Sequence, residues 1–149
     1  MPEELFPFHN GIVLYLGSQD VFLDPGDYTY TIQYRVKDQI GFYDEYDEIY
    51  WNAIGTENQV TTDRASCQVI LPEGTNVIQQ SAYVGEKGKS DRDFRVTQVG
   101  NIVRYAINRP LAPKEGFTVA VGFDKGVMPE PSFWDQLGSF IILFLASIF

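Results

Sequence analysis

The amino-acid sequence predicts an all-β domain, built as an antiparallel β-sandwich, from three observations. Aromatic residues make up 15% of the chain, with 9 Tyr and 11 Phe, and such residues favour strands over helices. Several segments alternate between apolar and polar side chains, which is the pattern of strands with one buried face. Turn-forming residues separate these segments at intervals of roughly 8 to 15 residues, with no helical pattern between them. A closed β-barrel is the main alternative.

The most regular alternation in the chain begins at Tyr28 and predicts a half-buried strand over residues 28–36. Its apolar face carries Tyr28, Tyr30, Ile32, Tyr34 and Val36. Less regular strand patterns occur, in chain order, at 12–16, 48–54, 65–71, 81–84 and 94–99, and clear alternation returns at 103–107 and 117–123.

Two short motifs suggest the kind of sandwich. Residues 23–28 and 111–117 both run Leu-x-Pro, then Gly, then an aromatic residue that begins an alternating segment. This order is typical of the corners that lead into strands of immunoglobulin-like and fibronectin-like sandwiches. We therefore expect a sandwich of that type over residues 1–128.

The last thirteen residues, 137–149, are free of charge and almost entirely apolar. As a helix they would span about 20 Å, which is short of the roughly 30 Å of a bilayer core. They lack a polar face, so we expect the start of a transmembrane helix after a linker at 129–136, with a buried core helix as the alternative. The residues expected at the membrane are Trp134, Leu137, Phe140, Ile141, Ile142, Leu143, Phe144, Leu145, Ile148 and Phe149.

Charge and cysteine content exclude several classes of function. The formal net charge of −9 opposes binding to nucleic acid and to anionic lipid surfaces. The single Cys67 cannot form an intrachain disulfide, and we expect it to be a small core residue. With His9 as the sole histidine, in a solvated tail, a zinc site has no ligand set. No Gly-rich loop precedes a helix, so we expect no cofactor.

Several separated blocks of the sequence resemble one family. The run at 23–34, the block Asp-Glu-Ile-Tyr-Trp-Asn-Ala-Ile-Gly at 47–55 and shorter matches as far as residue 131 resemble the predicted membrane proteins called domain of unknown function 2207. The resemblance implies an exported β-rich domain between a signal peptide and transmembrane helices, with no established enzymatic activity. It also implies that this chain begins after the signal peptide and ends inside the first membrane helix. At 58–62 the chain reads Asn-Gln-Val-Thr-Thr, where the family usually carries Trp and a Pro-Ile step.

An acidic cluster is the first candidate site. Asp44, Glu45, Asp47 and Glu48 supply oxygen ligands of the kind that calcium prefers, although the spacing of helix-loop-helix calcium sites is absent. A pair of these carboxylates is also a candidate acid and base for an enzyme acting on cell-envelope carbohydrate or peptide. The alternative to both is a solvated loop that leads into a strand.

Aromatic residues near this cluster form the second candidate site. In the strand at 48–54, Tyr50 and Trp51 point to opposite faces, so one faces the core and the other faces away from it. A buried Trp51 would fill the sandwich centre, whereas an exposed Tyr50 or Tyr83 would offer a partner a stacking contact.

The sequence therefore predicts a noncatalytic extracytoplasmic domain of a membrane-anchored protein, serving as an interaction or sensing module. Its expected partners are membrane lipid, through the C-terminal helix, and an unknown protein or envelope component. The alternatives are an envelope-acting enzyme that uses residues 44–48 and a purely structural domain of the parent protein.

Overall fold

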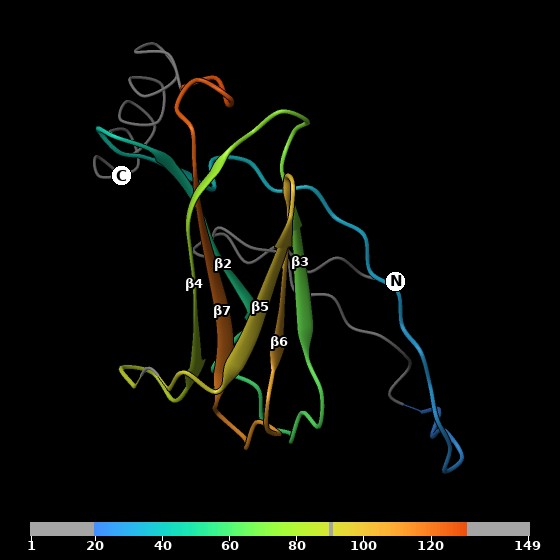
Figure 1. Ribbon diagram of the computed structural model, residues 1–149. Helices are drawn as coiled ribbons and strands as arrows, with labels where there is room; N and C mark the ends of the chain where they lie inside the picture. Colours follow the sequence, from blue (N-terminus) through green and yellow to red (C-terminus); the bar gives the residue numbers. More distant parts are fainter. Residues whose placement is uncertain (1–19, 90, 131–149) are drawn as a thin grey trace, which may run out of the picture. The chain divides into compact units, whose positions relative to one another are not determined.

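The computed structural model describes residues 20–89 and 91–130. The chain divides into two compact units, residues 1–35 and 36–149. All strands of the described part lie in the second unit (Figure 1). In chain order they are β1 (Ile40–Phe42), β2 (Asp47–Ile54), β3 (Ser66–Ile70), β4 (Val77–Gly85), β5 (Phe94–Val99), β6 (Ile102–Ile107) and β7 (Gly116–Phe123).

The strands form two antiparallel sheets. One has the order β1-β2-β7-β4 and the other the order β3-β6-β5. The described residues contain no helix. The expected all-β class with antiparallel sheets is therefore confirmed, and the immunoglobulin-like or fibronectin-like connection of the strands stays a prediction.

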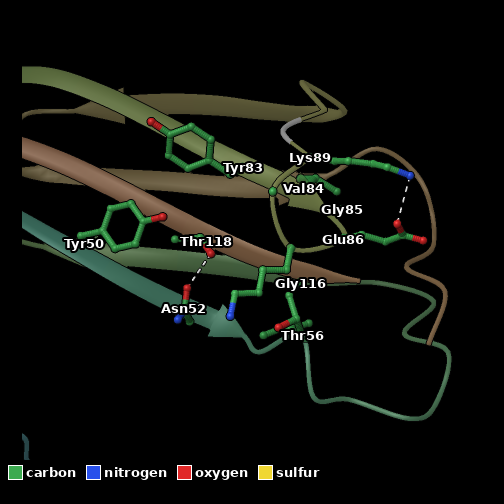
Figure 2. A pocket seen from close by; sticks show the side chains of 13 residues that line it. Tyr50, Asn52, Thr56, Tyr83, Val84, Gly85, Glu86, Lys89, Gly116 and Thr118 are labelled. Atoms are coloured by element: carbon green, nitrogen blue, oxygen red, sulfur yellow. Dashed lines mark hydrogen bonds and ion pairs between the residues drawn. The ribbon is translucent and has the colours of Figure 1, made fainter. Parts of the chain in front are cut away.

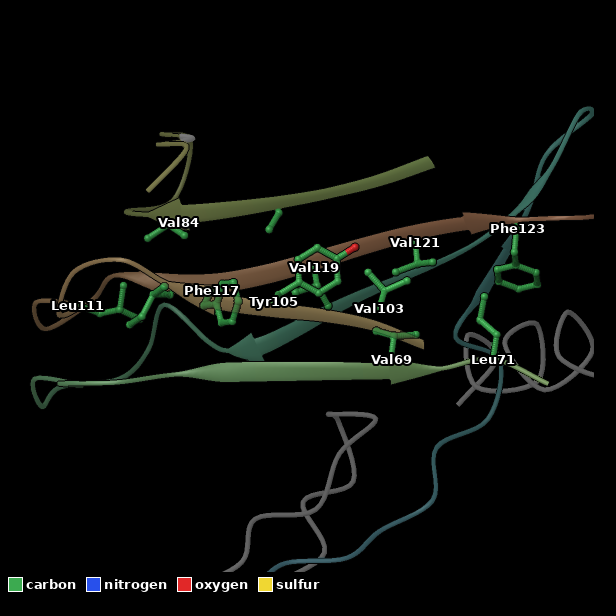
Figure 3. Close-up of a cluster of buried hydrophobic side chains, with 12 residues drawn as sticks. Val69, Leu71, Val84, Val103, Tyr105, Leu111, Phe117, Val119, Val121 and Phe123 are labelled. Carbon is green, nitrogen blue, oxygen red and sulfur yellow. The ribbon is translucent and has the colours of Figure 1, made fainter. Parts of the chain in front are cut away.

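The hydrophobic core lies between the two sheets. Phe117, Val119, Val121 and Phe123, all on one face of β7, are fully buried, and Figure 3 shows them directed toward residues of β3 and β6 such as Val69 and Val103. Burying large apolar side chains stabilises the fold by about 1.5–3 kcal/mol each. The large apolar residues at odd positions of β7 thus face the core, while the small residues Gly116, Ala120 and Gly122 on the other face are also buried.

One polar group crosses the core. Tyr105, on β6, is buried, and its hydroxyl donates a 2.9 Å hydrogen bond to the backbone oxygen of Ala120 on β7. Burial raises the pKa of the Tyr105 hydroxyl. A buried hydroxyl without a hydrogen-bond partner would destabilise the fold, and the bond to Ala120 satisfies this group. Because β6 and β7 belong to different sheets, the same bond also connects the two sheets.

The expected strand at 28–36 is wrong. The structure has no strand within residues 20–39, and the five apolar side chains from Tyr28 to Val36 are 47 to 66% exposed. A strand needs a neighbouring backbone to complete its hydrogen-bond ladder, which alternation alone does not supply. Conversely, β1 has only three residues and no alternation, and it forms because it pairs with β2 from Ile40 to Phe42.

The other strand predictions are correct to within a few residues, except that 12–16 lies outside the described residues. Most of the expected linker 129–136 and all of the expected membrane segment 137–149 lie outside them too. Over residues 20–89 and 91–130, no helix has the length and hydrophobicity to cross a membrane.

Candidate functional site

The outer face of the four-stranded sheet carries a regular array of side chains. β7 lies between β2 and β4, and the even-numbered residues of β7 face away from the core. Cross-strand neighbours place Tyr50 and Ser81 on either side of Ala120. The next row places Asn52 and Tyr83 on either side of Thr118. Tyr50 and Tyr83 are therefore diagonal neighbours on either side of Thr118 and Ala120 of the central strand.

The tyrosine rings stand next to each other above this strand (Figure 2). The ring centroids of Tyr50 and Tyr83 are 6.2 Å apart and the rings are inclined by 41°, which is within the usual range for an attractive aromatic pair. Tyr50 is 54% and Tyr83 39% exposed. Since large aromatic residues are mostly buried, a pair exposed on a sheet face is a candidate contact for a ligand.

Two glycines at the ends of β7 let neighbouring residues lie close against its outer face. A Cβ on Gly116 would lie 2.9 Å from Thr56 Cγ2 and 3.0 Å from a backbone oxygen. A Cβ on Gly122 would lie 2.6 Å from Gln79 Cγ. We call the floor made of Gly116, Thr118, Ala120 and Gly122 and flanked by Tyr50 and Tyr83 the outer-face trough.

Two hollows lie along the trough and share both tyrosines. The larger, of about 530 Å³, extends past Asn52 and Thr118 to the loop after β4. The smaller, of about 180 Å³, extends past Ser81 and Ala120 toward Glu48 and Gln79. The trough therefore accommodates an elongated ligand better than a compact one.

Polar groups occur at both ends of the trough. Thr118 Oγ1 donates to Asn52 Oδ1 at 2.6 Å, and Gln79 Nε2 donates to Glu48 Oε2 at 3.2 Å. These bonds orient the amides while leaving the Asn52 amide donors and the Gln79 carbonyl oxygen able to bind a ligand.

The loop after β4 closes the far end of the larger hollow (Figure 2). Lys89 and Glu86 form an exposed 3.0 Å ion pair there, and Gly88, at φ 85°, provides a left-handed turn. The hydrogen bond to Glu86 is the largest influence on the pKa of Lys89 and raises it. This wall is charged and surface-exposed.

Arg109 connects the end of this loop to the start of β7. Its guanidinium binds Glu115 through two bonds, of 2.6 and 2.9 Å, and lies 3.4 Å from Asp91 and 3.2 Å from Asp93. The paired geometry is the strong form of an Arg–carboxylate contact. Hydrogen bonds from Arg109 and from the Ala112 backbone lower the pKa of Glu115 to about 2. Glu115 in turn raises the pKa of Arg109.

The structure does not bring the acidic cluster together. Asp44 and Glu45 are exposed in the turn between β1 and β2, while Asp47 and Glu48 are successive strand residues and point to opposite faces. Of the four, only Glu48 borders the trough. Among residues 20–89 and 91–130, no group of three or more His, Cys, Asp or Glu is placed to hold a metal ion.

Asp47 has a different environment from its neighbours. It is fully buried, and its Oδ1 lies 3.3 Å from the ammonium of Lys125. Partial desolvation lowers the pKa of Lys125, but bonds to Asp47 and Glu130 outweigh this effect and raise it. Lys125 also donates to the backbone oxygen of Tyr43. Lys125, in the segment after β7, is therefore bound both to the β1–β2 turn and to the first residue of β2.

Trp51 lies on the opposite face of β2 from Tyr50. It is partly buried against the core and borders a separate hollow of about 460 Å³, with Cys67 of β3. Cys67 is also half-buried, and burial raises the pKa of its thiol. Neither residue borders the outer-face trough.

Sequence reasoning named Tyr50 and Tyr83 but missed the polar residues and loop around them. One feature of the sequence could have indicated the site, namely the small residues at even positions from 116 to 122. They predict a strand whose outward-facing side chains are short. The strand order that brings Asn52 and Gln79 to opposite sides of this floor is a long-range property. Local periodicity cannot supply it.

Comparison with known proteins identifies the family. The "Uncharacterized protein YciQ" of Escherichia coli (strain K12) is 27% identical over 128 residues, which cover 84% of this chain and 20% of YciQ. The chain thus spans about one fifth of that relative's length. No solved structure matches the chain significantly. Residues 10–123 match the family model described as the N-terminal domain of predicted membrane protein DUF2207. The resemblance seen in the sequence is therefore confirmed, and this chain belongs to the DUF2207 family of predicted membrane proteins.

Proposed function

We propose that this domain is a noncatalytic interaction or sensing module of a larger membrane protein, and that it recognises its ligand in the outer-face trough. The observation that carries the proposal is the exposed Tyr50–Tyr83 pair above a floor of small residues, with hollows on both sides. The pair differs from singly exposed tyrosines such as Tyr30, because the two rings and the hollows beside them form one continuous surface, which is typical of a binding site.

A binding role has more support than an enzymatic one. Glycoside hydrolysis needs two carboxyl groups about 5–9.5 Å apart. Of the acidic cluster only Glu48 borders the trough, and the carboxylate of Glu86, in the loop that closes the larger hollow, is held in an exposed ion pair with Lys89. The other polar groups of the trough, Asn52, Thr118 and Gln79, are suited to orienting a ligand by hydrogen bonds rather than to transferring protons.

We further propose that the domain lies outside the cytoplasm and that the apolar residues 137–149 anchor it. The support is membership of a predicted membrane protein family together with the uncharged, apolar character of those residues. Placement is tested with Glu73→Cys, in the exposed turn after β3, in a full-length protein whose native cysteines, Cys67 included, are replaced by serine. A membrane-impermeant maleimide should label this cysteine in spheroplasts without lysis. Labelling only after lysis would refute the extracytoplasmic location.

The binding role is tested by nuclear magnetic resonance of the 149-residue chain in detergent, titrated with fractions of a cell-envelope extract. We expect shifted amide signals to cluster on β2, β4 and β7 around Tyr50 and Tyr83. The combined change Tyr50→Ala and Tyr83→Ala should abolish the shifts, whereas Tyr30→Ala, at a 58% exposed tyrosine in the first unit, should leave them unchanged. Shifts that lie elsewhere, or no shifts with any fraction, would refute the proposal.

A further inference from the structure

We propose that the ligand of the outer-face trough is a linear, uncharged saccharide chain. This inference rests on the proposed function, because it identifies the class of molecule that the same trough binds. Three features of the trough lead to it: the shape of the site, the state of its backbone groups and the chemistry of its side chains.

The shape favours a chain over a single small molecule. Glu48 and Asn52 lie four residues apart on β2, which corresponds to roughly 13 Å along a strand. The two hollows lie on either side of the tyrosine pair and share both rings. A ligand that uses both hollows must therefore pass over Tyr50 and Tyr83, with contacts on each side of them.

The backbone disfavours an extended peptide. Peptides often bind sheets by adding a strand, which requires a free edge with unpaired N–H and C=O groups. β7, the floor of the trough, is paired with β2 on one side and with β4 on the other, so a peptide strand could be added only at the sheet edges, β1 and β4, and not over the trough floor. Recognition on this face must therefore come from side chains.

The side chains match the two surfaces of a sugar ring. The C–H groups on the face of a pyranose carry partial positive charge, and they are attracted to the negative face of an aromatic ring. Tyr50 and Tyr83 offer two such faces at an angle of 41°, which suits successive sugar rings that are twisted relative to each other. A flat ligand could not stack on both.

The polar groups match the hydroxyls around a sugar ring. Each sugar hydroxyl both donates and accepts, so it can bind the Asn52 amide donors at one end and the Gln79 carbonyl oxygen at the other. The charged groups that line the two hollows are two carboxylates, Glu48 and Glu86, and two ammonium groups, Lys87 and Lys89, so their formal charges cancel. With a net charge of −9 on the chain, a neutral saccharide is favoured over an acidic one.

The test is calorimetric titration of the 149-residue chain in detergent with cellotetraose and with chitotetraose, two neutral linear tetrasaccharides. We expect at least one of them to bind, and the corresponding monosaccharide to bind much more weakly. Tyr50→Ala and Tyr83→Ala should each weaken the binding by about tenfold, the upper end of the range for one aromatic contact. Tyr50→Phe should keep it within about threefold, since the ring face is retained. Tyr30→Ala serves as the matched control and should have no effect.

The outcomes separate the saccharide from the proposed function. If neither tetrasaccharide binds, or if the double alanine variant binds as well as the unmodified chain, the saccharide proposal is overturned. If the envelope titration still shows a ligand that depends on the tyrosines and this ligand is a peptide or lipid, the binding module stands and only the ligand class is wrong. Circular dichroism of each variant, matched to that of the unmodified chain, excludes unfolding as the cause of lost binding.

Discussion

Residues 28–36 and the strand β7 have the same alternating pattern and different structures. In β7 the bulky residues at 117, 119, 121 and 123 are fully buried, and the backbone pairs with two neighbours. In residues 28–36 the five apolar side chains are about half exposed and the segment forms no strand. Alternation describes which side chains can share a face, but pairing and burial decide whether a strand forms.

The two segments also differ in their other face. Polar side chains of ordinary size, such as Gln33 and Arg35, alternate with the apolar residues of 28–36. In β7 the alternate positions carry Gly116, Thr118, Ala120 and Gly122. Side chains from β2 and β4 lean over this low face, so both faces of β7 are in use: one builds the core and the other builds the trough.

Hydrogen exchange should reveal the largest contrast between the two segments. Amides of β7 should exchange only through global unfolding, which requires on the order of 5–15 kcal/mol in an ordinary domain, whereas amides of residues 28–36 should exchange with a protection free energy near zero. Mass spectrometry of peptic fragments measures both in one experiment. Strong protection within 28–36 would show that this segment is paired and would end the contrast.

The next largest effect is expected from truncating one aromatic side chain in each segment. Phe117→Ala should lower the free energy of unfolding by about 3–5 kcal/mol, because it leaves a cavity in a fully buried position. Tyr30→Ala, at a 58% exposed position, should change it by less than about 0.5 kcal/mol. Urea unfolding curves give both values, and Phe117→Leu provides a milder change should the alanine variant fail to fold. Equal losses would mean that Tyr30 is buried in solution.

Adding a single methyl group distinguishes the segments more finely. Gly116→Ala should destabilise the domain by about 1–3 kcal/mol, because its Cβ would approach a backbone oxygen to 3.0 Å, which side-chain motion cannot relieve. Gly26→Ala, before the other alternating segment, places its Cβ no closer than 3.7 Å to any atom. It should be neutral or slightly stabilising. Thermal unfolding of the two variants measures the difference in stability. If Gly116→Ala left the stability unchanged, the space above position 116 would be large enough for a methyl group.

Most of the strands could be predicted from the sequence, because they are short, alternate and end at Pro or Gly turns. β1 could not, because Ile40–Phe42 has three residues and depends on its pairing with β2. The site could be predicted only in part. Tyr50 and Tyr83 could be singled out as aromatic residues on strands, but their approach to 6.2 Å depends on β7 lying between β2 and β4. Likewise, Asp47 and Glu48 are adjacent in sequence and yet point to opposite faces of β2.

The smallest expected effect concerns the ion pairs at the start of β7. Arg109→Met should cost about 0.5–1 kcal/mol near neutral pH, the upper part of the range for a surface ion pair, because the Arg109 and Glu115 side chains are partly exposed to solvent. The pKa of Glu115 is about 2 in the folded protein, compared with an ordinary value of 4.5. Its carboxylate therefore stabilises the fold above about pH 4.5, and this stabilisation is lost as the pH falls toward 2.

The difference in unfolding free energy between the unmodified chain and Arg109→Met should consequently shrink between pH 5 and pH 2, since protonated Glu115 no longer binds the guanidinium. Urea midpoints at several pH values measure this convergence. Arg104→Met is a suitable control, because Arg104 donates to the neutral amide of Gln68 and its contribution should not follow the titration of a partner. If the difference in unfolding free energy stayed constant down to pH 2, Arg109 would act through packing of its aliphatic stem. The start of β7 would then be stabilised by burial, as the core face of this strand is, and not by ion pairs.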